Sequence, residues 1–388
     1  MATVRLPTAD RTVEIYTLTG RPPALARRKA ADFPRIAYAA AHVVADPLAA
    51  YDPWLEPAID WDRTLAFRHR LWDLGLGVAE AMDTAQRGMG LSWTDAQDLI
   101  RRALAEAKTR DDALIACGAG TDHLAPSPAV SVDDVIRAYE EQVAFVEGHG
   151  GRIILMASRA LAAAAKGPDD YARVYGRILR QVQQPVIIHW LGEMFDPALQ
   201  GYWGSADHDV AMDTCLAILT EHASKVDGIK ISLLSKEKEI SMRRRLPAGV
   251  RMYTGDDFNY AELIRGDAVG HSDALLGIFD AIAPAASAGL AALGRGDEKA
   301  FFDILEPTVP LSRHIFKAPT RFYKTGVVFL AWLNGLQDHF VMVGGQESAR
   351  SVQHVAELFR LADQANALTD PELAAARMGR FLAVHGIG

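Results

Sequence analysis

Cysteine is almost absent from this sequence: Cys117 and Cys215 are the only two in 388 residues, and each lies within an apolar run. Two cysteines cannot form the disulfide framework of a small secreted protein, so we expect a reducing compartment. Apolar runs long enough to cross a bilayer, about 18 residues, are also missing. The first ten residues lack the apolar core of a signal peptide. These absences predict a cytoplasmic protein that does not enter a membrane.

An excess of basic charge is missing as well. The 41 lysines and arginines are outnumbered by 49 aspartates and glutamates, which gives a net charge of −8. A chain this acidic is a poor partner for a phosphate backbone, so no nucleic-acid partner is expected. With 49% hydrophobic and 23% charged residues, the composition is that of a globular protein and excludes a disordered or fibrous one. The length allows one large domain with an appendage, or two ordinary domains.

From about residue 34, short apolar runs alternate with amphipathic stretches. Apolar residues spaced three and four apart predict helices over 132–146 and 171–182. Strands that alternate with helices form a parallel sheet, and eight such units predict a closed (β/α)8 TIM barrel of the α/β class. An open doubly wound sheet would need a glycine-rich phosphate turn after its first strand, and residues 40–44 supply none. The eight expected strands are Arg35–Val44, Gly77–Met82, Ala113–Cys117, Ile153–Met156, Pro185–Trp190, Gly228–Leu233, Val250–Tyr253 and Ala268–Gly270.

The two ends of the chain differ in pattern from the barrel. Residues 4–18 alternate between apolar and polar around a turn at 9–11, which predicts a β-hairpin. After about residue 272 the strand pattern stops, and Ala274–Leu293 is rich in alanine and helical. The apolar helix around Val327–Trp332 favours a homodimer or homotetramer. The expected parts are an N-terminal β-hairpin extension (1–33), the barrel (34–285) and a C-terminal helical extension packed on the barrel (286–388).

Lys230 is the sharpest candidate for a catalytic residue. Barrels of this kind carry their active sites at the carboxyl ends of the strands, and Lys230 lies inside the otherwise apolar run 226–234. Burial of a lysine favours its neutral form, and a neutral amine can attack a carbonyl carbon. The alternative is a structural lysine that pairs with a carboxylate in the barrel core. Both interpretations are open on the residues alone.

Several stretches occur in the order found in one family of barrels. Gly228–Lys230 resembles the Schiff-base strand of the dihydrodipicolinate synthase and N-acetylneuraminate lyase superfamily of class I aldolases. This resemblance covers about residues 35–335 and implies a TIM barrel, a lyase activity with no cofactor beyond a covalent imine, and Lys230 as the residue that forms it. The other stretches that are similar to family motifs are Ala41–Pro47, Ile59–Asp62, Thr254–Asp257 and Leu305–Pro310.

Three family motifs are altered here, and the changes concern the substrate. The family's Gly-Thr-Thr-Gly-Glu turn reads Met82–Gln86, so both glycines that make room for an α-keto acid carboxylate are missing. His189 stands where the family has its proton-shuttling tyrosine, and the paired tyrosines after the fourth strand are absent from 157–159. The comparison predicts that the imine chemistry is retained and that the small-molecule carbonyl substrate is not pyruvate.

His189 and a set of polar residues complete the predicted site. On the fifth strand His189 would neighbour Lys230, and an imidazole with a pKa of about 6.5 can take and give a proton near neutrality. A histidine hydrogen-bonded within the core is the alternative. Of the adjacent Asp256 and Asp257, we expect one to cap the next helix and the other to face the barrel mouth. The residues expected to bind substrate are Asp83, Thr84, Asp122, Glu193, Gly255, Asp256 and His271.

Three functions are compatible with these residues. The first is a Schiff-base-forming lyase or aldolase that acts on a keto or aldehyde substrate, such as a keto sugar or sugar acid. The second is a divalent-metal-dependent sugar isomerase or lyase, in which Lys230 would act through its charge. The third is a non-catalytic barrel that binds a metabolite. No His-x-x-x-His or His-Glu-x-x-His spacing supports the second, for which the candidate ligands are His42, Asp83, Asp122, His123, His189, Glu193 and His271.

Overall fold

The computed structural model describes residues 2–387. Its internal contacts divide the chain into two compact units. The barrel unit consists of residues 35–41 and 77–277, and the helical unit consists of residues 2–34, 42–76 and 278–387. The three-part division expected from the sequence stays a prediction.

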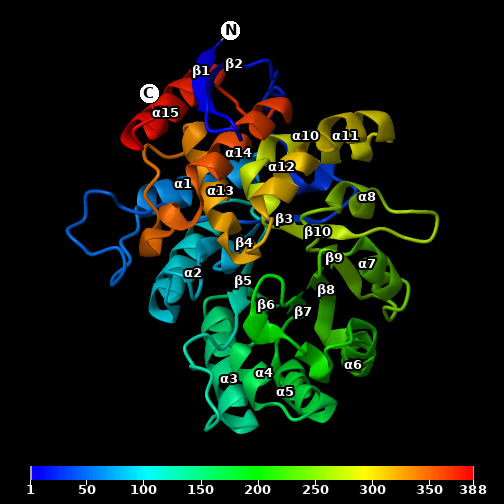
Figure 1. Ribbon diagram of the computed structural model, residues 1–388. Coiled ribbons are helices and arrows are strands. Elements are labelled where there is room, and N and C mark those ends of the chain that lie inside the picture. The colour runs from blue at the N-terminus through cyan, green and yellow to red at the C-terminus, as the bar shows by residue number, and fades with distance from the viewer. Residues whose placement is uncertain (1, 388) are drawn as a thin grey trace. The chain divides into compact units, whose positions relative to one another are not determined.

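The barrel unit is built on a closed barrel of eight parallel strands, counted within the described residues (Figure 1). Each strand pairs with the next one in the chain, and the last pairs with the first, so the predicted TIM barrel is confirmed. The strands are β3 (Ala37–Ala40), β4 (Gly77–Glu80), β5 (Ile115–Ala119), β6 (Arg152–Leu155), β7 (Val186–Leu191), β8 (Val226–Ser232), β9 (Arg251–Thr254) and β10 (Asp273–Leu276).

The last strand lies later in the chain than predicted. The prediction of a strand at Ala268–Gly270 was wrong, because these residues form a turn held by Asp267. Its Oδ1 atom accepts hydrogen bonds from the backbone N–H groups of Val269 (2.8 Å) and Gly270 (3.0 Å). The true strand, β10, begins at Asp273. Its other residues, Ala274–Leu276, belong to the segment that was predicted to be helical from its alanine content. The helical part of this segment starts at Ile278 with a short helix, Ile278–Ala281. A second helix starts at Ala283, with Pro284 in its first turn, where a missing N–H costs nothing.

Strand β8 differs from its neighbours in what it contributes to the inside of the barrel. The residues that alternate with Ile229 and Ile231 are Gly228, Lys230 and Ser232, and none is a large apolar side chain. A cluster of buried apolar residues draws on the other strands and their ends: Tyr38, Ala40, Ala79, Met82, Ala116, Ile154, Met156, Ile187, Tyr253 and Leu275. The apolar core therefore leaves one polar stripe, and Lys230 is at its centre.

Helices follow the strands of the barrel unit, and their boundaries have local causes. Ser92 and Ser131 each cap a helix by accepting a hydrogen bond from the backbone N–H three residues later, and the aspartate at that position bonds back to the serine N–H. Both helices predicted from apolar spacing are confirmed. The helices are α2 (Trp93–Ala107), α3 (Val132–Gly148), α4 (Arg159–Ala164), α5 (Pro168–Gln181), α6 (His208–Glu221), α7 (Lys236–Arg243) and α8 (Tyr260–Arg265), with 3-10 turns η2 (Asp83–Ala85), η3 (Pro197–Leu199), η4 (Tyr202–Gly204) and η5 (Ala223–Lys225).

The helical unit combines the predicted N-terminal hairpin with helices from the end of the chain. Strands β1 (Thr3–Pro7) and β2 (Val13–Thr17) pair antiparallel, and β1 packs on the last two helices (Figure 1). The buried Asp363 carboxylate fastens the segment after β2 by accepting hydrogen bonds from the N–H groups of Thr19 and Gly20. The helices are α1 (Trp61–Asp73), α9 (Ile278–Ala281), α10 (Ala283–Gly294), α11 (Glu298–Leu305), α12 (Thr308–Ile315), α13 (Tyr323–Leu333), α14 (Val352–Gln364) and α15 (Pro371–Val384), with 3-10 turns η1 (Ala30–Asp32), η6 (Thr320–Phe322) and η7 (Val343–Ala349).

Helix α13 contains the apolar residues from which an oligomer was predicted. All its residues, Tyr323 to Leu333, are buried within the single chain. Its apolar character therefore needs no second subunit to explain it, and the homodimer or homotetramer stays a prediction. Among residues 2–387, no helix has both the length and the apolar character that crossing a bilayer requires.

Candidate active site

Lys230 lies on β8 in register with His189 on β7 and Tyr253 on β9. Only 7% of its surface is exposed. Burial lowers the pKa of the Lys230 amine below its ordinary value of 10.5, and the negative charges of Asp257 and Asp83 oppose that effect. The structure thus places a nearly buried amine, with a lowered pKa, at the carboxyl half of a barrel strand.

His189 is the immediate neighbour of Lys230 and is 1% exposed. Its Nε2 atom is 3.3 Å from the Ser232 hydroxyl, and its Nδ1 atom has no hydrogen-bond partner among residues 2–387. Burial, together with the charge of Lys230, holds the pKa of His189 well below 6.5. The expectation that His189 titrates near neutrality is therefore not met, because the imidazolium form is too costly in this environment.

Gly255 leaves the space in which Lys230 is held. A Cβ atom on Gly255 would lie 2.3 Å from the Ser232 Oγ, 2.6 Å from the Ile231 carbonyl oxygen and 2.7 Å from the Lys230 Cε. All three distances are shorter than the contacts that Cβ atoms make in proteins. The Ile231 carbonyl cannot move aside easily, because it belongs to the backbone of a barrel strand. Gly255, predicted to bind substrate, instead lies against the side chain of Lys230.

We expect Gly255→Ala to reduce turnover by about 100-fold, because displacing a reacting amine by about 1 Å has an effect of that size. Steady-state kinetics on the substrate found by the trapping experiment described below provide the measurement. Gly148→Ala is the control, since Gly148 is an exposed residue of α3, has no positive φ, and has no atom within 4 Å of a Cβ built on it. Equal turnover in the Gly255 variant and the native protein would contradict this account of Gly255.

The two adjacent aspartates after β9 have different roles. Asp256 accepts hydrogen bonds at Oδ1 from the N–H groups of Phe258 (2.8 Å) and Asn259 (3.1 Å), and at Oδ2 from the Asn259 side-chain amide (2.8 Å). These bonds hold the turn that leads into α8, so the carboxylate predicted to bind substrate has a local structural role. Asp257, 3% exposed, is the aspartate whose charge acts on Lys230.

A cleft with a cavity volume of about 70 Å³ opens beside His189 in the barrel unit. Asp83 lines this cleft, and its carboxylate makes no hydrogen bond or ion pair with any side chain that the structure describes. Lys230 itself does not line the cleft, but its neighbour on β7, His189, does. The charge of Asp83 acts on the Lys230 amine. The remaining lining residues are Arg87, Gly120, Thr121, Asp122, Leu124, Pro126, Met156, Ala157, Arg159, Leu191, Asp196 and Leu199.

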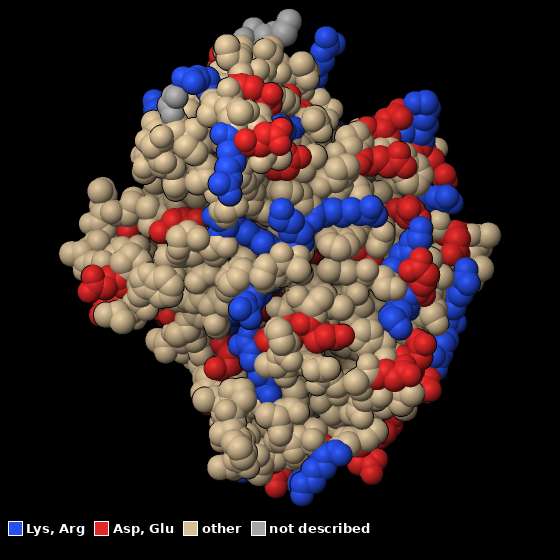
Figure 2. Space-filling view, in the orientation of Figure 1, with Lys and Arg blue, Asp and Glu red and all other residues tan. Residues whose placement is uncertain are grey.

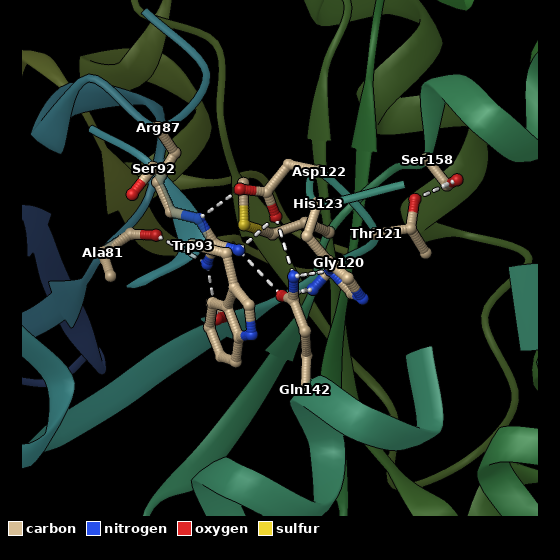
Figure 3. A network of polar contacts seen from close by, with 12 residues as sticks. Ala81, Arg87, Ser92, Trp93, Gly120, Thr121, Asp122, His123, Gln142 and Ser158 are labelled. Carbon is tan, nitrogen blue, oxygen red and sulfur yellow. Dashed lines mark hydrogen bonds and ion pairs between the residues drawn. The ribbon is translucent and has the colours of Figure 1, made fainter. Parts of the chain in front are cut away.

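One wall of the cleft is fixed by Arg87 (Figure 3). Its guanidinium forms an ion pair with Asp122 and donates to the Gly118 carbonyl (2.9 Å) and the Gln142 side-chain oxygen (2.7 Å). It also lies 5.1 Å from the centre of the Trp93 ring. Burial alone would raise the pKa of Asp122, but the charge and hydrogen bonds of Arg87 lower it below its ordinary value. Asp122 therefore lines the cleft as predicted, but its charge is already paired.

Thr121 and a second arginine, Arg159, also line the cleft. The hydroxyls of Thr121 and Ser158 lie 2.5 Å apart, and Figure 3 shows them directed toward each other. Arg159 pairs through Nε with Asp196, which leaves its terminal nitrogens without a hydrogen-bond partner among the described residues. Its guanidinium is 40% exposed, so these nitrogens can meet a ligand.

Three other residues predicted to bind substrate do not line the cleft. Thr84 is 1% exposed inside η2. Glu193 is paired with His208 of α6, with 3.1 Å between Oε2 and Nε2. His271 precedes β10 rather than following the eighth strand, so it lies at the amino-terminal end of the barrel. This last difference follows directly from the misplaced strand. Among residues 2–387, no three His, Cys, Asp or Glu side chains are grouped as a metal site would require.

Ser232 and Arg87 were missed in the sequence analysis, and for Ser232 a signal exists. Ser232 follows Lys230 by two residues, so strand alternation would have placed both on the inner face. Arg87 has no such signal, because its partners come from α3 and from the end of β5.

A buried carboxyl group behind the site gives the protein a pH-dependent stability. Glu239 on α7 is 1% exposed and accepts hydrogen bonds from the hydroxyls of Ser272 (2.6 Å) and Thr254 (2.9 Å). Burial raises the pKa of Glu239 to about 8, against the opposing effect of these hydrogen bonds. The folded protein therefore keeps a proton that the unfolded chain releases above its ordinary pKa of 4.5, and stability falls as the pH rises from 4.5 to 8.

We expect Glu239→Gln to remove the fall in stability between pH 4.5 and 8, because glutamine has the shape and donor pattern of the protonated acid. Between pH 4.5 and 8 the native protein should lose about 1.4 kcal/mol of unfolding free energy per pH unit relative to the variant. Above pH 8 the variant should therefore be more stable than the native protein by a few kcal/mol. Denaturant unfolding at pH 5 to 9 measures the difference, with Glu237→Gln on the exposed side of the same helix as the control. Identical pH profiles for the native protein and the Glu239 variant would contradict the assignment.

Comparison with known proteins agrees with this geometry at the level of the fold. Dihydrodipicolinate synthase from Oceanobacillus iheyensis superposes with a TM-score of 0.61 at 16% identity, over 87% of this chain and 98% of that one. The Aquifex aeolicus synthase superposes with a TM-score of 0.64 at 12% identity, over 87% of this chain and 100% of that one. The Acinetobacter baumannii enzyme was solved in complex with pyruvate. It superposes with a TM-score of 0.62 at 16% identity, over 86% of this chain and 99% of that one. The resemblance noted in the sequence is confirmed for the fold.

Searches by sequence reach a family without an assigned activity. No curated protein matches the chain. One family model, described as "Protein of unknown function (DUF993)", matches residues 4–387. Because the match covers nearly the whole chain, the protein belongs to this family, and the structure gives it the fold of the dihydrodipicolinate synthases.

Proposed function

We propose that the protein is a lyase of the class I aldolase type, in which Lys230 forms an imine with a keto or aldehyde substrate. The observation that carries the proposal is the Lys230 amine itself: nearly buried, with a lowered pKa, and in register with His189, which lines an open cleft. A lowered pKa increases the share of free amine near neutral pH, which is the reactive form. The fold shared with dihydrodipicolinate synthases is consistent with a lyase.

The reaction proceeds through covalent attachment to Lys230. The Nζ lone pair attacks the carbonyl carbon, the oxygen takes up protons and leaves as water, and an iminium ion remains. A base then removes the proton of the β-hydroxyl, and the electrons of the bond between the α and β carbons move toward the iminium nitrogen. An aldehyde is released and an enamine stays on the enzyme. Protonation of the enamine carbon and addition of water release the second carbonyl product and regenerate the amine.

His189 is the base in this scheme and acts as a neutral imidazole. Its Nδ1 atom, with no partner among residues 2–387, is available to the substrate hydroxyl, while Nε2 lies against the Ser232 hydroxyl. A neutral imidazole can accept a proton at one nitrogen and give up the proton at the other, so no imidazolium accumulates. This behaviour matches a histidine whose pKa is held well below 6.5.

Asp83 favours a substrate without a carboxylate next to its carbonyl group. Its own carboxylate makes no hydrogen bond or ion pair within residues 2–387, lines the cleft and acts on Lys230. A keto acid such as pyruvate, the ligand in the Acinetobacter baumannii structure, would bring a second negative charge to the same place. Hydroxyl groups are better partners for Asp83 and for Thr121, which lines the same cleft. The preferred substrate is therefore a keto sugar, or a sugar acid whose carboxylate is remote from the carbonyl.

Reductive trapping tests this proposal. The native protein is incubated with borohydride and each of a panel of keto sugars, aldoses, sugar acids and pyruvate, and its intact mass is measured. We expect a mass increase with a hydroxylated carbonyl compound, none in Lys230→Ala, and the same increase in Lys225→Ala. Lys225, the residue before β8, is the matched control because its amine donates to the Val182 carbonyl (2.8 Å). A mass increase that persists in Lys230→Ala would overturn the proposal.

Asp83→Asn tests the substrate class separately. Removing the negative charge should increase the yield of the pyruvate adduct at least several-fold, because the repulsion of a keto acid carboxylate disappears. Adduct yields with pyruvate and with the best sugar are compared in native and variant protein under identical conditions. If native protein traps pyruvate as readily as the variant does, Asp83 does not select against keto acids, although the role of Lys230 would stand.

A further inference from the structure

The helical unit contains a cavity of its own, between the end of α12 and the start of α14. It has about 1100 Å³ of empty space and is open to solvent. None of the residues discussed at the Lys230 site belongs to it. The residues that line it are Ala9, His314, Lys317, Ala349, Arg350, Ser351, Gln353, His354, Glu357 and Arg360.

The cavity is positively charged in a chain whose net charge is −8. Lys317, Arg350 and Arg360 face a single lining carboxylate, Glu357. Arg360 is partly neutralised, since it pairs with Glu357 and with Glu14 outside the cavity. Figure 2 shows Lys and Arg side chains gathered over the part of the surface where α12 and α14 lie.

The two remaining cations differ in what they can offer a ligand. Arg350 donates to the carbonyl groups of Lys317 (2.6 Å) and Pro319 (3.1 Å), so its charge is fixed in place by the backbone. The Lys317 ammonium makes no hydrogen bond or ion pair with any residue that the structure describes, and the side chain is exposed. Lys317 is therefore available to pair with an anion.

Helix α14 directs its amino-terminal end at the same cavity. It runs for 13 residues from Val352, and Ser351 caps it by accepting a hydrogen bond from the His354 N–H (3.2 Å). The first-turn N–H groups and the helix dipole favour negative charge at this end. Ser351 and Gln353 both line the cavity, so the helix end forms part of its wall.

His354, in the first turn of α14, is a buried polar side chain whose ring nitrogens are not hydrogen-bonded within residues 2–387. The side chain is 5% exposed and lines the cavity. The ring stacks on His314 at 4.2 Å between centres, and the His314 Nε2 donates to the His354 carbonyl. Burial, followed by the charges of His314, Arg350 and Lys317, lowers the pKa of His354 to about 3. A buried imidazole without partners is costly, and an anion would accept its N–H.

We propose that this cavity binds a small phosphate-type anion, held by the Lys317 ammonium, the first-turn N–H groups of α14 and the His354 ring. A tetrahedral oxyanion offers acceptor oxygens in several directions, which suits donors that come from three separate segments. Either free inorganic phosphate or the phosphate group of a phosphorylated metabolite presents this chemistry. The site does not depend on imine formation at Lys230.

Isothermal titration of the full chain with inorganic phosphate and with glycerol phosphate tests this inference, with sodium chloride at equal ionic strength as the reference. We expect saturable binding of at least one phosphate compound and none of chloride. Tighter binding of glycerol phosphate identifies a metabolite phosphate as the ligand, and equal or weaker binding identifies the free ion. Binding should be at least ten-fold weaker in Lys317→Ala, whose exposed side chain is not needed for folding.

Lys299→Ala is the matched control, because Lys299 is an exposed lysine paired with Asp303 on α11 of the same unit. Its phosphate affinity should equal that of the native protein. The imidazole resonances of His354, assigned by comparison with His354→Phe, should shift on addition of phosphate and remain unchanged with chloride. Failure of both phosphate compounds to bind, or equal affinity in Lys317→Ala and the native protein, would overturn the inference. Neither result bears on the trapping at Lys230.

Discussion

Replacement of Lys230 by methionine is expected to lower turnover by roughly 10⁴-fold or more, because the variant has no amine with which to form the imine. Methionine keeps the unbranched length of the side chain and suits a buried site. The amine is 7% exposed, and its burial carries a free-energy cost that methionine avoids. We therefore expect the variant to fold, which circular dichroism and thermal unfolding would check. Turnover is measured on the sugar identified by reductive trapping.

Lys230→Arg separates a nucleophilic lysine from an electrostatic one. Arginine keeps the positive charge that faces Asp83 and Asp257 but does not form an imine with a carbonyl compound. The account predicts that this variant is as inactive as Lys230→Met. Turnover within ten-fold of native in Lys230→Arg, together with loss of turnover in Lys230→Met, would mean that Lys230 acts through its charge.

Replacement of His189 by glutamine is expected to lower kcat by about 10²- to 10⁴-fold, the usual contribution of a general base. Glutamine can still bond to the Ser232 hydroxyl but cannot take up a proton. Imine formation at Lys230 should persist, so borohydride should still trap the adduct. The contrast between retained trapping and lost turnover would assign His189 to proton transfer rather than to the shape of the pocket.

The pH dependence of turnover provides an independent check on His189. Because the pKa of His189 lies well below 6.5, the native rate should show no inflection near that pH. The Lys230 amine must be free to react, so the rate should rise with pH through a pKa below 10.5. An inflection near pH 6.5 that disappears in His189→Gln would show that His189 titrates normally, contrary to the structure.

Much of the barrel could be predicted from local sequence patterns. Seven of the eight predicted strands overlap the observed ones, because a strand buried on both faces leaves an apolar run that helices on either side interrupt. The eighth prediction failed because Val269 lies in a turn that Asp267 fixes with its side chain. Alanine content then assigned the real strand to the following helix, since Ala274–Leu276 has no feature that separates a short strand from a helix start.

The site was predictable where one strand determines it and not where several elements meet. Lys230 and His189 lie on consecutive strands, which are neighbours in a barrel of this type, and the two residues are in register. The order of the strands can be predicted from the sequence. The choice between Asp256 and Asp257 depends on which carboxylate reaches the backbone of its own turn. The ion pair of Arg87 with Asp122 joins the segments after β4 and β5, and the pairing of Glu193 with His208 involves a helix that begins many residues later. Such contacts depend on three-dimensional packing.

The central claim is that the Lys230 amine forms a covalent imine with the substrate. Its most direct test is to reduce the complex with borohydride, digest the protein and locate the modified residue by tandem mass spectrometry. The account predicts that one lysine carries the added mass, and that it lies in the β8 peptide at position 230. A modification spread over exposed lysines such as Lys299, with Lys230 unmodified, would contradict the account.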